Sequence, residues 1–203
     1  MEISNSSIRP SSIVNILTLR YDPSINPNLP KKTWKDFEPI EEPVNPTFIE
    51  NSICDEIEKK LNYTNEQEIS IALSGGVDSA LMLSLLRETK PDVKINAVSI
   101  KFANSIDETP IASRIAEKYN ADHHIIDLDN YLSELPKAIS IIKLPFWDLH
   151  WYYVVKKSQT LSKTLISGDG GDELFAGYTF RYKKFLSLTS ENSSPHEKVK
   201  AYL

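Results

Sequence analysis

The stretch EISIALSGGVDSALMLSLLR, residues 68 to 87, contains a strand, a glycine turn and a helix in immediate succession. The apolar, β-branched run at 68–73 has the length and composition of a buried strand. Gly75 and Gly76 follow it directly and allow a tight turn. The residues from about 78 to 87 are apolar on nearly all sides, which predicts a helix buried against a sheet.

The same alternation of strand and helix continues along the chain. Further strands are expected at 94–100, 123–127 and 163–167, with helices at about 109–119, 130–142 and 148–162 and a helical region from Glu173 onward. This order predicts an α/β fold, a doubly wound, mostly parallel sheet with helices on both faces, similar to a Rossmann fold. In such sheets ligands bind beyond the carboxyl ends of the strands.

All six glycines of the chain fall in two loops at this edge of the predicted sheet. SGGVDS, 74–79, follows one strand, and GDGGDELFAGY, 168–178, follows another. We therefore expect the two glycine loops to face each other across one crevice.

The first 46 residues differ from the rest, because they hold seven of the twelve prolines. We interpret 1–46 as an extended, proline-rich arm in which only 13–21, IVNILTLRY, has the pattern of a strand. From Thr47 the apolar residues Ile49, Ile53, Ile57 and Leu61 recur every four residues, which indicates an amphipathic helix. Residues 47–203 are thus expected to form one domain.

The bulk composition excludes several classes of protein. A formal net charge of −5 without a basic stripe argues against nucleic acid as a partner. A single cysteine, Cys54, allows no internal disulfide and no cysteine-held metal. Neither a signal sequence nor an apolar run of membrane-spanning length is present, so we expect a cytoplasmic protein that does not enter a membrane.

The first glycine loop has the features of a phosphate cradle. Its backbone N–H groups, the positive end of the following helix and the hydroxyls of Ser74 and Ser79 are all suited to bind phosphate. Asp78 would repel a phosphate unless a magnesium ion lay between them. The pattern is neither a Walker loop nor a dinucleotide fingerprint. The structural alternative is a plain strand-to-helix turn with Asp78 stabilising the helix dipole.

The second loop brings three carboxylates together within five residues, Asp169, Asp172 and Glu173. Carboxylates this close repel one another, so the pattern favours a bound cation or a substrate ammonium. A solvated acidic turn at a helix start is the structural alternative.

Together the two loops resemble the synthetase domain of the glutamine-dependent asparagine synthetases, over about 68–186. SGGVDS looks like the pyrophosphate loop of the N-type ATP pyrophosphatases, whose fold is of the adenine nucleotide alpha hydrolase type. SGGxDS alone is also similar to loops of GMP, NAD and argininosuccinate synthetases and of tRNA-thiolating enzymes, whereas GDGGDELFAGY points to the asparagine synthetase branch.

The resemblance implies an AMP-forming carbon–nitrogen ligase. The family splits ATP between its α and β phosphates, transfers AMP to a carboxylate and lets ammonia displace AMP, so ATP and Mg²⁺ are the implied cofactors, with aspartate and ammonia as the other substrates. By position, Ser74, Gly75, Gly76 and Ser79 would hold pyrophosphate, and Asp78 with Asp172 would bind magnesium. Leu73, Ile100, Ser167 and Gly168 match positions that line the nucleotide. Asp169 matches an acidic position beside the reacting carboxylate and amine.

The chain departs from the family pattern at both ends. Full-length members begin with a glutaminase domain whose nucleophile is an N-terminal cysteine, whereas Met1 is followed here by Glu2. They also continue well beyond the second motif, whereas Leu203 lies only about 25 residues after Tyr178. We therefore expect ammonia that is free or delivered by a separate glutaminase, and a domain truncated at its C-terminal side.

Two other functions stay open on the sequence alone. The chain would be a nucleotide-binding subunit if it needed a completing partner, or a degenerate relative if it bound ATP without finishing the reaction. A tRNA-modifying enzyme of the same superfamily is disfavoured, because it would want a basic surface and reactive cysteines.

Three other features are assigned to packing. Cys54 is expected to be a small apolar residue of the amphipathic helix. His123 and His124 have no acid or cysteine at ligand spacing. Trp147, Trp151 and Val154 have helical spacing, which favours the core, although the aromatic run at 145–153 could instead line an acceptor pocket.

Overall fold

The computed structural model describes residues 9–19, 45–64, 66–102, 105–130, 132–142, 149–175 and 177–202. Its centre is a four-stranded, fully parallel sheet with the strand order β3-β2-β1-β4. The strands are β1 (Glu68–Ala72), β2 (Lys94–Phe102), β3 (Asp122–Leu128) and β4 (Leu165–Ile166). The predicted α/β class and the four strands predicted for the sheet are therefore confirmed.

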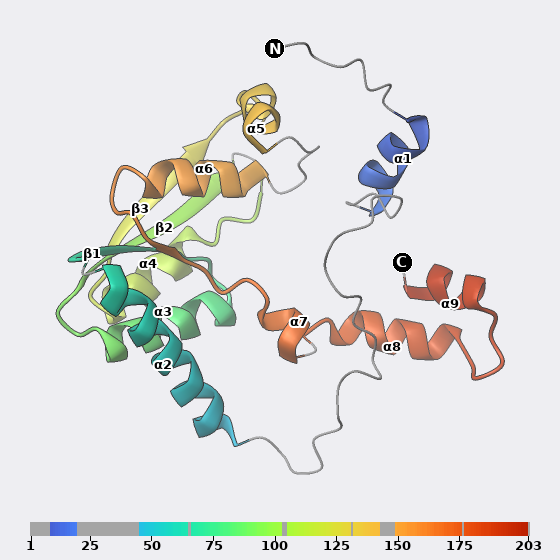
Figure 1. Cartoon of the computed structure of the whole chain (residues 1–203), viewed down its shortest axis with the longest axis horizontal. Coiled ribbons are helices and arrows are strands. Elements are labelled where there is room, and N and C mark those ends of the chain that lie inside the picture. Colours follow the sequence, from blue (N-terminus) through green and yellow to red (C-terminus); the bar gives the residue numbers. More distant parts are fainter. Residues whose placement is uncertain are drawn as a thin grey trace.

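Helices cover both faces of the sheet (Figure 1). The helices that pack around the sheet or follow it are α2 (Pro46–Thr64), α3 (Val77–Thr89), α4 (Thr109–Lys118), α5 (Leu135–Ile142), α6 (Leu149–Ser158), α7 (Gly171–Phe175), α8 (Thr179–Leu188) and α9 (Pro195–Tyr202). Helices α2, α3 and α4 lie on one face, and α6 lies on the other. Crossover helices on both faces are the usual cover of a parallel sheet.

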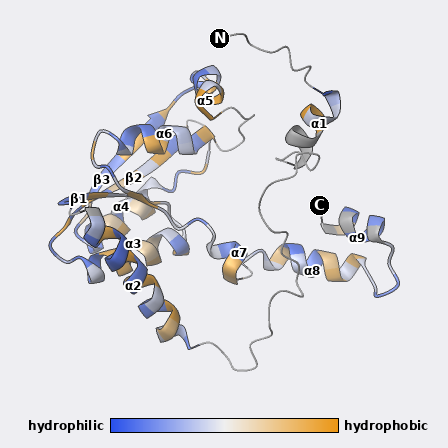
Figure 2. Cartoon of the chain, in the orientation of Figure 1, coloured by the Kyte–Doolittle hydropathy of each residue, from blue (hydrophilic) through white to orange (hydrophobic). Residues whose placement is uncertain are grey.

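The larger hydrophobic core lies between the sheet and α2, α3 and α4. Ile69 and Ile71 of β1 are buried there with Leu83 and Leu86 of α3. In Figure 2 hydrophobic and hydrophilic colours alternate along α2, as expected of an amphipathic helix. Cys54 packs against the same core, as its place on the amphipathic helix predicts.

Helix α3 is less completely buried than its composition predicts. Leu83, Leu85 and Leu86 are buried, but Leu81 is 41% exposed and Val77 is 79% exposed. Leu81 lines an open apolar cavity, described below, instead of contacting another layer. Helix α3, which is apolar on nearly all sides, therefore has one side that the described part of the chain does not cover.

The strand predicted at 13–21 is wrong where the structure describes it. Residues Pro10–Leu19 form the helix α1, in which Ser12 N–H donates to Arg9 O at 3.0 Å. Proline is favoured in the first turn of a helix, and the apolar residues of this run also fit a helical period. The remaining residues of the predicted extended arm, 1–8 and 20–44, lie outside the described residues.

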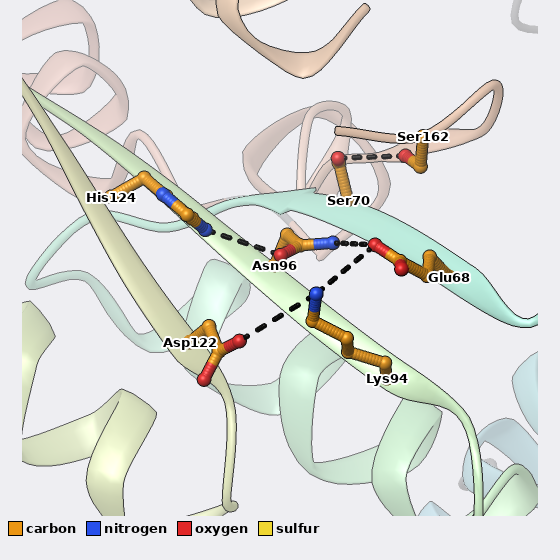
Figure 3. Close-up of polar contacts among 7 residues, drawn as sticks. All are labelled: Glu68, Ser70, Lys94, Asn96, Asp122, His124 and Ser162. Carbon is orange, nitrogen blue, oxygen red and sulfur yellow. Dashed lines mark hydrogen bonds and ion pairs between the residues drawn. The ribbon is translucent and has the colours of Figure 1, made fainter. Parts of the chain in front are cut away.

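A chain of polar side chains crosses the sheet near the amino ends of its strands (Figure 3). Asn96 is 1% exposed; its Nδ2 donates to Glu68 Oε2 at 3.3 Å, and its Oδ1 lies 3.1 Å from His124 Nε2. Lys94 lies 3.3 Å from the same Glu68 oxygen and 3.9 Å from Asp122 Oδ2. Because the buried amide is satisfied on both sides in this register, the network helps to fix the alignment of β1, β2 and β3.

Both histidines of β3 have structural contacts, as predicted. His123 Nε2 lies 2.7 Å from Ser99 Oγ, and its Nδ1 lies 2.8 Å from Ser113 Oγ. His124 belongs to the Asn96 network. Desolvation is the main cause that lowers the pKa of each, reinforced at His124 by Lys157 and partly opposed there by Asp122.

These lowered pKa values predict a loss of stability on mild acidification. Below the ordinary histidine pKa of about 6.5 the unfolded chain binds protons that the folded chain resists, so the free energy of unfolding decreases as the pH falls through this range. Urea unfolding between about pH 7.5 and about pH 5.5 should show the decrease, and His124→Gln should reduce it. Stability that stays constant or rises on acidification would contradict the assignment.

Candidate active site

The first glycine loop, between β1 and α3, is held by short polar contacts. Ser74 N–H donates to Ser79 Oγ at 3.1 Å, and Gly76 N–H donates to Ser74 Oγ at 3.0 Å. The two serine hydroxyls lie 3.0 Å apart. The two serines therefore fold the loop back on the start of α3, whose first-turn N–H groups have no partner within the helix.

The second glycine loop, between β4 and α7, lies directly against the start of α3. A Cβ atom added to Gly168 would lie 2.8 Å from the backbone carbon of Asp78 and 2.9 Å from the Ser79 nitrogen. One added to Gly171 would lie 2.8 Å from Asp78 Cγ and Oδ2. The backbone contact at Gly168 requires glycine there, whereas at Gly171 an added side chain would meet the end of the Asp78 side chain. These contacts confirm that the two loops lie against each other, as predicted.

A cavity of about 250 Å³ lies where the two loops meet. It is lined by residues of β1, β2, α3, α6 and the second loop, namely Ala72, Leu73, Ser74, Asp78, Ser79, Val98, Ile100, His150, Trp151, Val154, Ser167, Gly168 and Asp169. Eight of these residues belong to the predicted site: Leu73, Ser74, Asp78, Ser79, Ile100, Ser167, Gly168 and Asp169. Gly75 and Gly76 complete the same loop but do not line this cavity.

Helix α6 contributes lining residues that the sequence pattern had assigned differently or not at all. Trp151 is half-buried and lines the cavity, so it is not a core residue as its helical spacing favoured. Val154 is 4% exposed and belongs to both the core and the cavity wall. Trp147 lies outside the described residues. The lining residue His150 was missed, because a single histidine on a helix carries no motif.

A second, larger cavity of about 680 Å³ opens on the other side of the second loop. It lies between α2, α3 and α7 and shares Asp78, Ser167, Gly168 and Asp169 with the first cavity. Its lining is mainly apolar and includes Phe48, Leu81, Leu174 and Phe175, which are exposed to different degrees between 41% and 79%. One loop thus separates a cavity with a mixed polar and apolar lining from a larger, mainly apolar one.

The three acids of the second loop have different surroundings. Glu173 accepts a hydrogen bond from Tyr178 Oη at 2.6 Å, which lowers the pKa of the carboxyl and raises that of Tyr178 to about 12. Asp172 packs so closely against Gly177 that a Cβ added there would lie 1.8 Å from Asp172 Oδ1. Asp169 lines both cavities.

The donor set fits a magnesium ion that is bound mainly through a substrate. Asp78 is half-buried beside Gly171, so one carboxylate lies at the loop contact, whereas Asp172 packs against Gly177 and is not among the residues that line either cavity. Among the described residues no group of three or more His, Cys, Asp or Glu side chains is placed to hold a metal by itself. Magnesium commonly uses one or two carboxylates together with phosphate oxygens, and this site can supply the former.

The asparagine synthase family profile matches residues 59–201, which is most of the chain. The chain belongs to the asparagine synthase family. It is 30% identical over 124 residues to the putative glutamine-hydrolyzing asparagine synthetase 2 of Methanocaldococcus jannaschii. It is 29% identical over 143 residues to the glutamine-hydrolyzing asparagine synthetase 1 of Bacillus subtilis.

These relatives are much longer than the region they share with this member of the asparagine synthase family. The two matches cover 59% and 67% of this chain but only 24% and 22% of the relatives. Among solved structures, the glutamine-dependent NAD⁺ synthetase of Acinetobacter baumannii in complex with ADP matches 68% of this chain and 29% of that chain, with a TM-score of 0.50 and 17% identity. This likeness supports the fold.

The described helices offer no candidate for a membrane span, since none is both long and apolar enough.

The close backbone contact predicts that Gly168→Ala destabilises this asparagine synthase domain. The added methyl group would overlap the Asp78–Ser79 peptide, and such overpacking typically costs about 1–3 kcal/mol. Urea unfolding should show this loss. Ser167→Ala, which adds no atom at the neighbouring position, is the matched control and should cost less; equal effects of both variants would contradict the contact.

Proposed function

We propose that the chain is an ATP-dependent ligase domain of the asparagine synthetase type, which activates a carboxylate, with aspartate as the proposed acceptor, for amidation by ammonia. The observation that carries this proposal is the meeting of the two glycine loops at Asp78, where eight residues expected from the sequence line one cavity. Family membership supports the same reaction type.

In this proposal the smaller cavity, of about 250 Å³, holds the nucleotide. Leu73 and Ile100 provide apolar walls for it, and Ser167 and Gly168 approach it from the second loop. The hydroxyls of Ser74 and Ser79 and the N–H groups at the positive end of α3 favour the pyrophosphate, and Gly75 and Gly76 let the loop backbone approach it closely. Asp78 and Asp172 would hold Mg²⁺, which when bound neutralises charge on the departing pyrophosphate.

The proposed reaction has two steps. An oxygen of the acceptor carboxylate attacks the α-phosphorus of ATP, and the bond to the bridging oxygen breaks as pyrophosphate leaves. Ammonia then attacks the acyl carbon, and the bond to AMP breaks to give the amide. In this proposal Asp169 takes the proton that the nitrogen loses; its position in the lining of both cavities supports this role.

A second candidate is a nucleotide-binding subunit whose activity needs a partner. The observation that favours it is the apolar cavity of about 680 Å³ beside Asp169, whose lining includes the exposed Leu174 and Phe175. Large open apolar surfaces commonly mark interaction sites. In this candidate a completing subunit would cover the cavity, and a separate glutaminase would deliver ammonia.

Product analysis distinguishes the two candidates. The chain is incubated with ATP, Mg²⁺ and ammonium, with and without aspartate, and the nucleotides are separated by chromatography. AMP and pyrophosphate that form only with aspartate are the expected result for the ligase. ADP and phosphate would refute it, whereas ATP binding without turnover would favour the subunit.

The metal assignment predicts that Asp78→Asn and Asp172→Asn each weaken ATP binding in the presence of Mg²⁺. Removal of a charged metal ligand should reduce the affinity by about ten-fold or more, whereas binding measured in EDTA should change little. Isothermal titration calorimetry gives both values. Asp55→Asn, on the exposed side of α2, is the control, and unchanged Mg²⁺-dependent binding in both site variants would remove the assignment.

A further inference from the structure

The N–H group of Gly75, in the middle of the proposed phosphate loop, already has an anionic partner. It donates to Oε2 of Glu108 at 3.1 Å, a residue 33 positions away in the sequence. A carboxylate oxygen here has the charge and acceptor geometry of a phosphate oxygen. Neither the motif nor the family likeness had indicated a role for Glu108.

Glu108 is held rigidly at the start of α4. Thr109 donates to Asp107 Oδ1 through its N–H at 3.0 Å and its hydroxyl at 2.6 Å, and Lys101 lies 3.4 Å from Asp107 Oδ2. The carbonyl of Glu108 accepts from the N–H groups of Ile111 and Ala112, both at 3.0 Å. Its backbone therefore belongs to the first turn of a well-anchored helix.

The contact to the loop also includes close packing. A Cβ atom added to Gly75 would lie 3.4 Å from the Cβ atoms of both Glu108 and Ile111. Between the loop and α4 there is thus room for little more than a methyl group, and the hydrogen bond joins two closely spaced segments. This geometry is that of a brace between neighbouring segments.

The bond also changes which donors of the loop are available for an anion. The N–H groups of Ser74, Gly75 and Gly76 have partners in Ser79 Oγ, Glu108 Oε2 and Ser74 Oγ. The N–H groups at 77–79, in the first turn of α3, have no partner within the helix and carry its positive end. Because the hydrogen bond to Glu108 fixes the Gly75 backbone on the side of α4, it restrains the orientation of these N–H groups.

We propose that Glu108 is a positioning residue, which holds the Gly75 backbone against α4 so that the start of α3 is preorganised for the pyrophosphate of ATP. The inference rests on the proposed function of the loop. In this role Glu108 acts as a hydrogen-bond acceptor. The loop requires the side-chain oxygen of Glu108 at the Gly75 N–H group, and it does not require the negative charge of the carboxylate. A rigid, prearranged donor set lowers the cost of ordering the site when the anion binds.

Two variants separate the acceptor role from the charge. Glu108→Gln keeps an oxygen at the end of the side chain, whereas Glu108→Ala removes it. We expect Glu108→Ala to weaken Mg-ATP binding by about ten-fold, and Glu108→Gln to stay within about three-fold of the wild type. Glu117→Ala, an exposed glutamate at the other end of α4, is the matched control and should not change binding.

An NMR measurement tests the contact independently of nucleotide binding. The chain holds six glycines, so labelling with ¹⁵N-glycine gives a simple spectrum in which the Gly75 amide can be followed. Glu108→Ala should shift the Gly75 signal and speed its exchange with water, and Glu108→Gln should restore slower exchange. A wild-type chain that bound no Mg-ATP would refute the proposed function, while the exchange rate of Gly75 still decides the contact.

Three results would overturn the inference. The first is an unchanged Gly75 exchange rate in Glu108→Ala. The second is Mg-ATP binding by Glu108→Ala that equals or exceeds that of the wild type, which would make Glu108 a competitor of phosphate. The third is a Glu108→Gln variant as weak as Glu108→Ala, which would show that the charge and not the acceptor is required.

Discussion

The site depends on the close approach of two backbone segments, Gly168 to Gly171 on one side and Asp78–Ser79 on the other. Parallel pairing of β4 with β1 brings both carboxyl ends to one edge, and the absence of a side chain at Gly168 and Gly171 removes the remaining separation. The cavity walls, the environment of Asp78 and the position of Asp169 all follow from this contact. A side chain at either glycine would separate the loops by roughly the width of a methyl group.

Most of the fold could be predicted because its signals are local. Each strand of the sheet has an apolar run of its own, and the crossover rule for parallel strands places both glycine loops at one edge. The prediction fails where an element depends on its surroundings. The apolar run of α1 fits a strand period as well as a helix, and Leu81 is exposed because the described chain supplies no layer to cover it.

The candidate site was predictable to the extent that its residues lie in two motifs. His150 and Glu108 reach it from elements far away in the sequence, and no spacing rule connects them to a loop. The number of carboxylates near the two loops also does not by itself predict how many of them would bind a metal ion. Glu173 accepts a hydrogen bond from Tyr178, and Glu108 accepts one from the Gly75 amide. The five acids near the loops therefore do not all have the same role; they are Asp78, Glu108, Asp169, Asp172 and Glu173.

The two ends of the sheet are secured very differently. At the amino ends, the buried Asn96 links three strands through hydrogen bonds. At the carboxyl ends, the second loop hangs on β4, which pairs with β1 only at Leu165 and Ile166. Opening so short a strand breaks few backbone hydrogen bonds, so local opening at β4 is expected to cost less free energy than unfolding of β1, β2 and β3. A ligand that contacts both loops would therefore stabilise the pairing of β4 with β1 as well as fill the cavity.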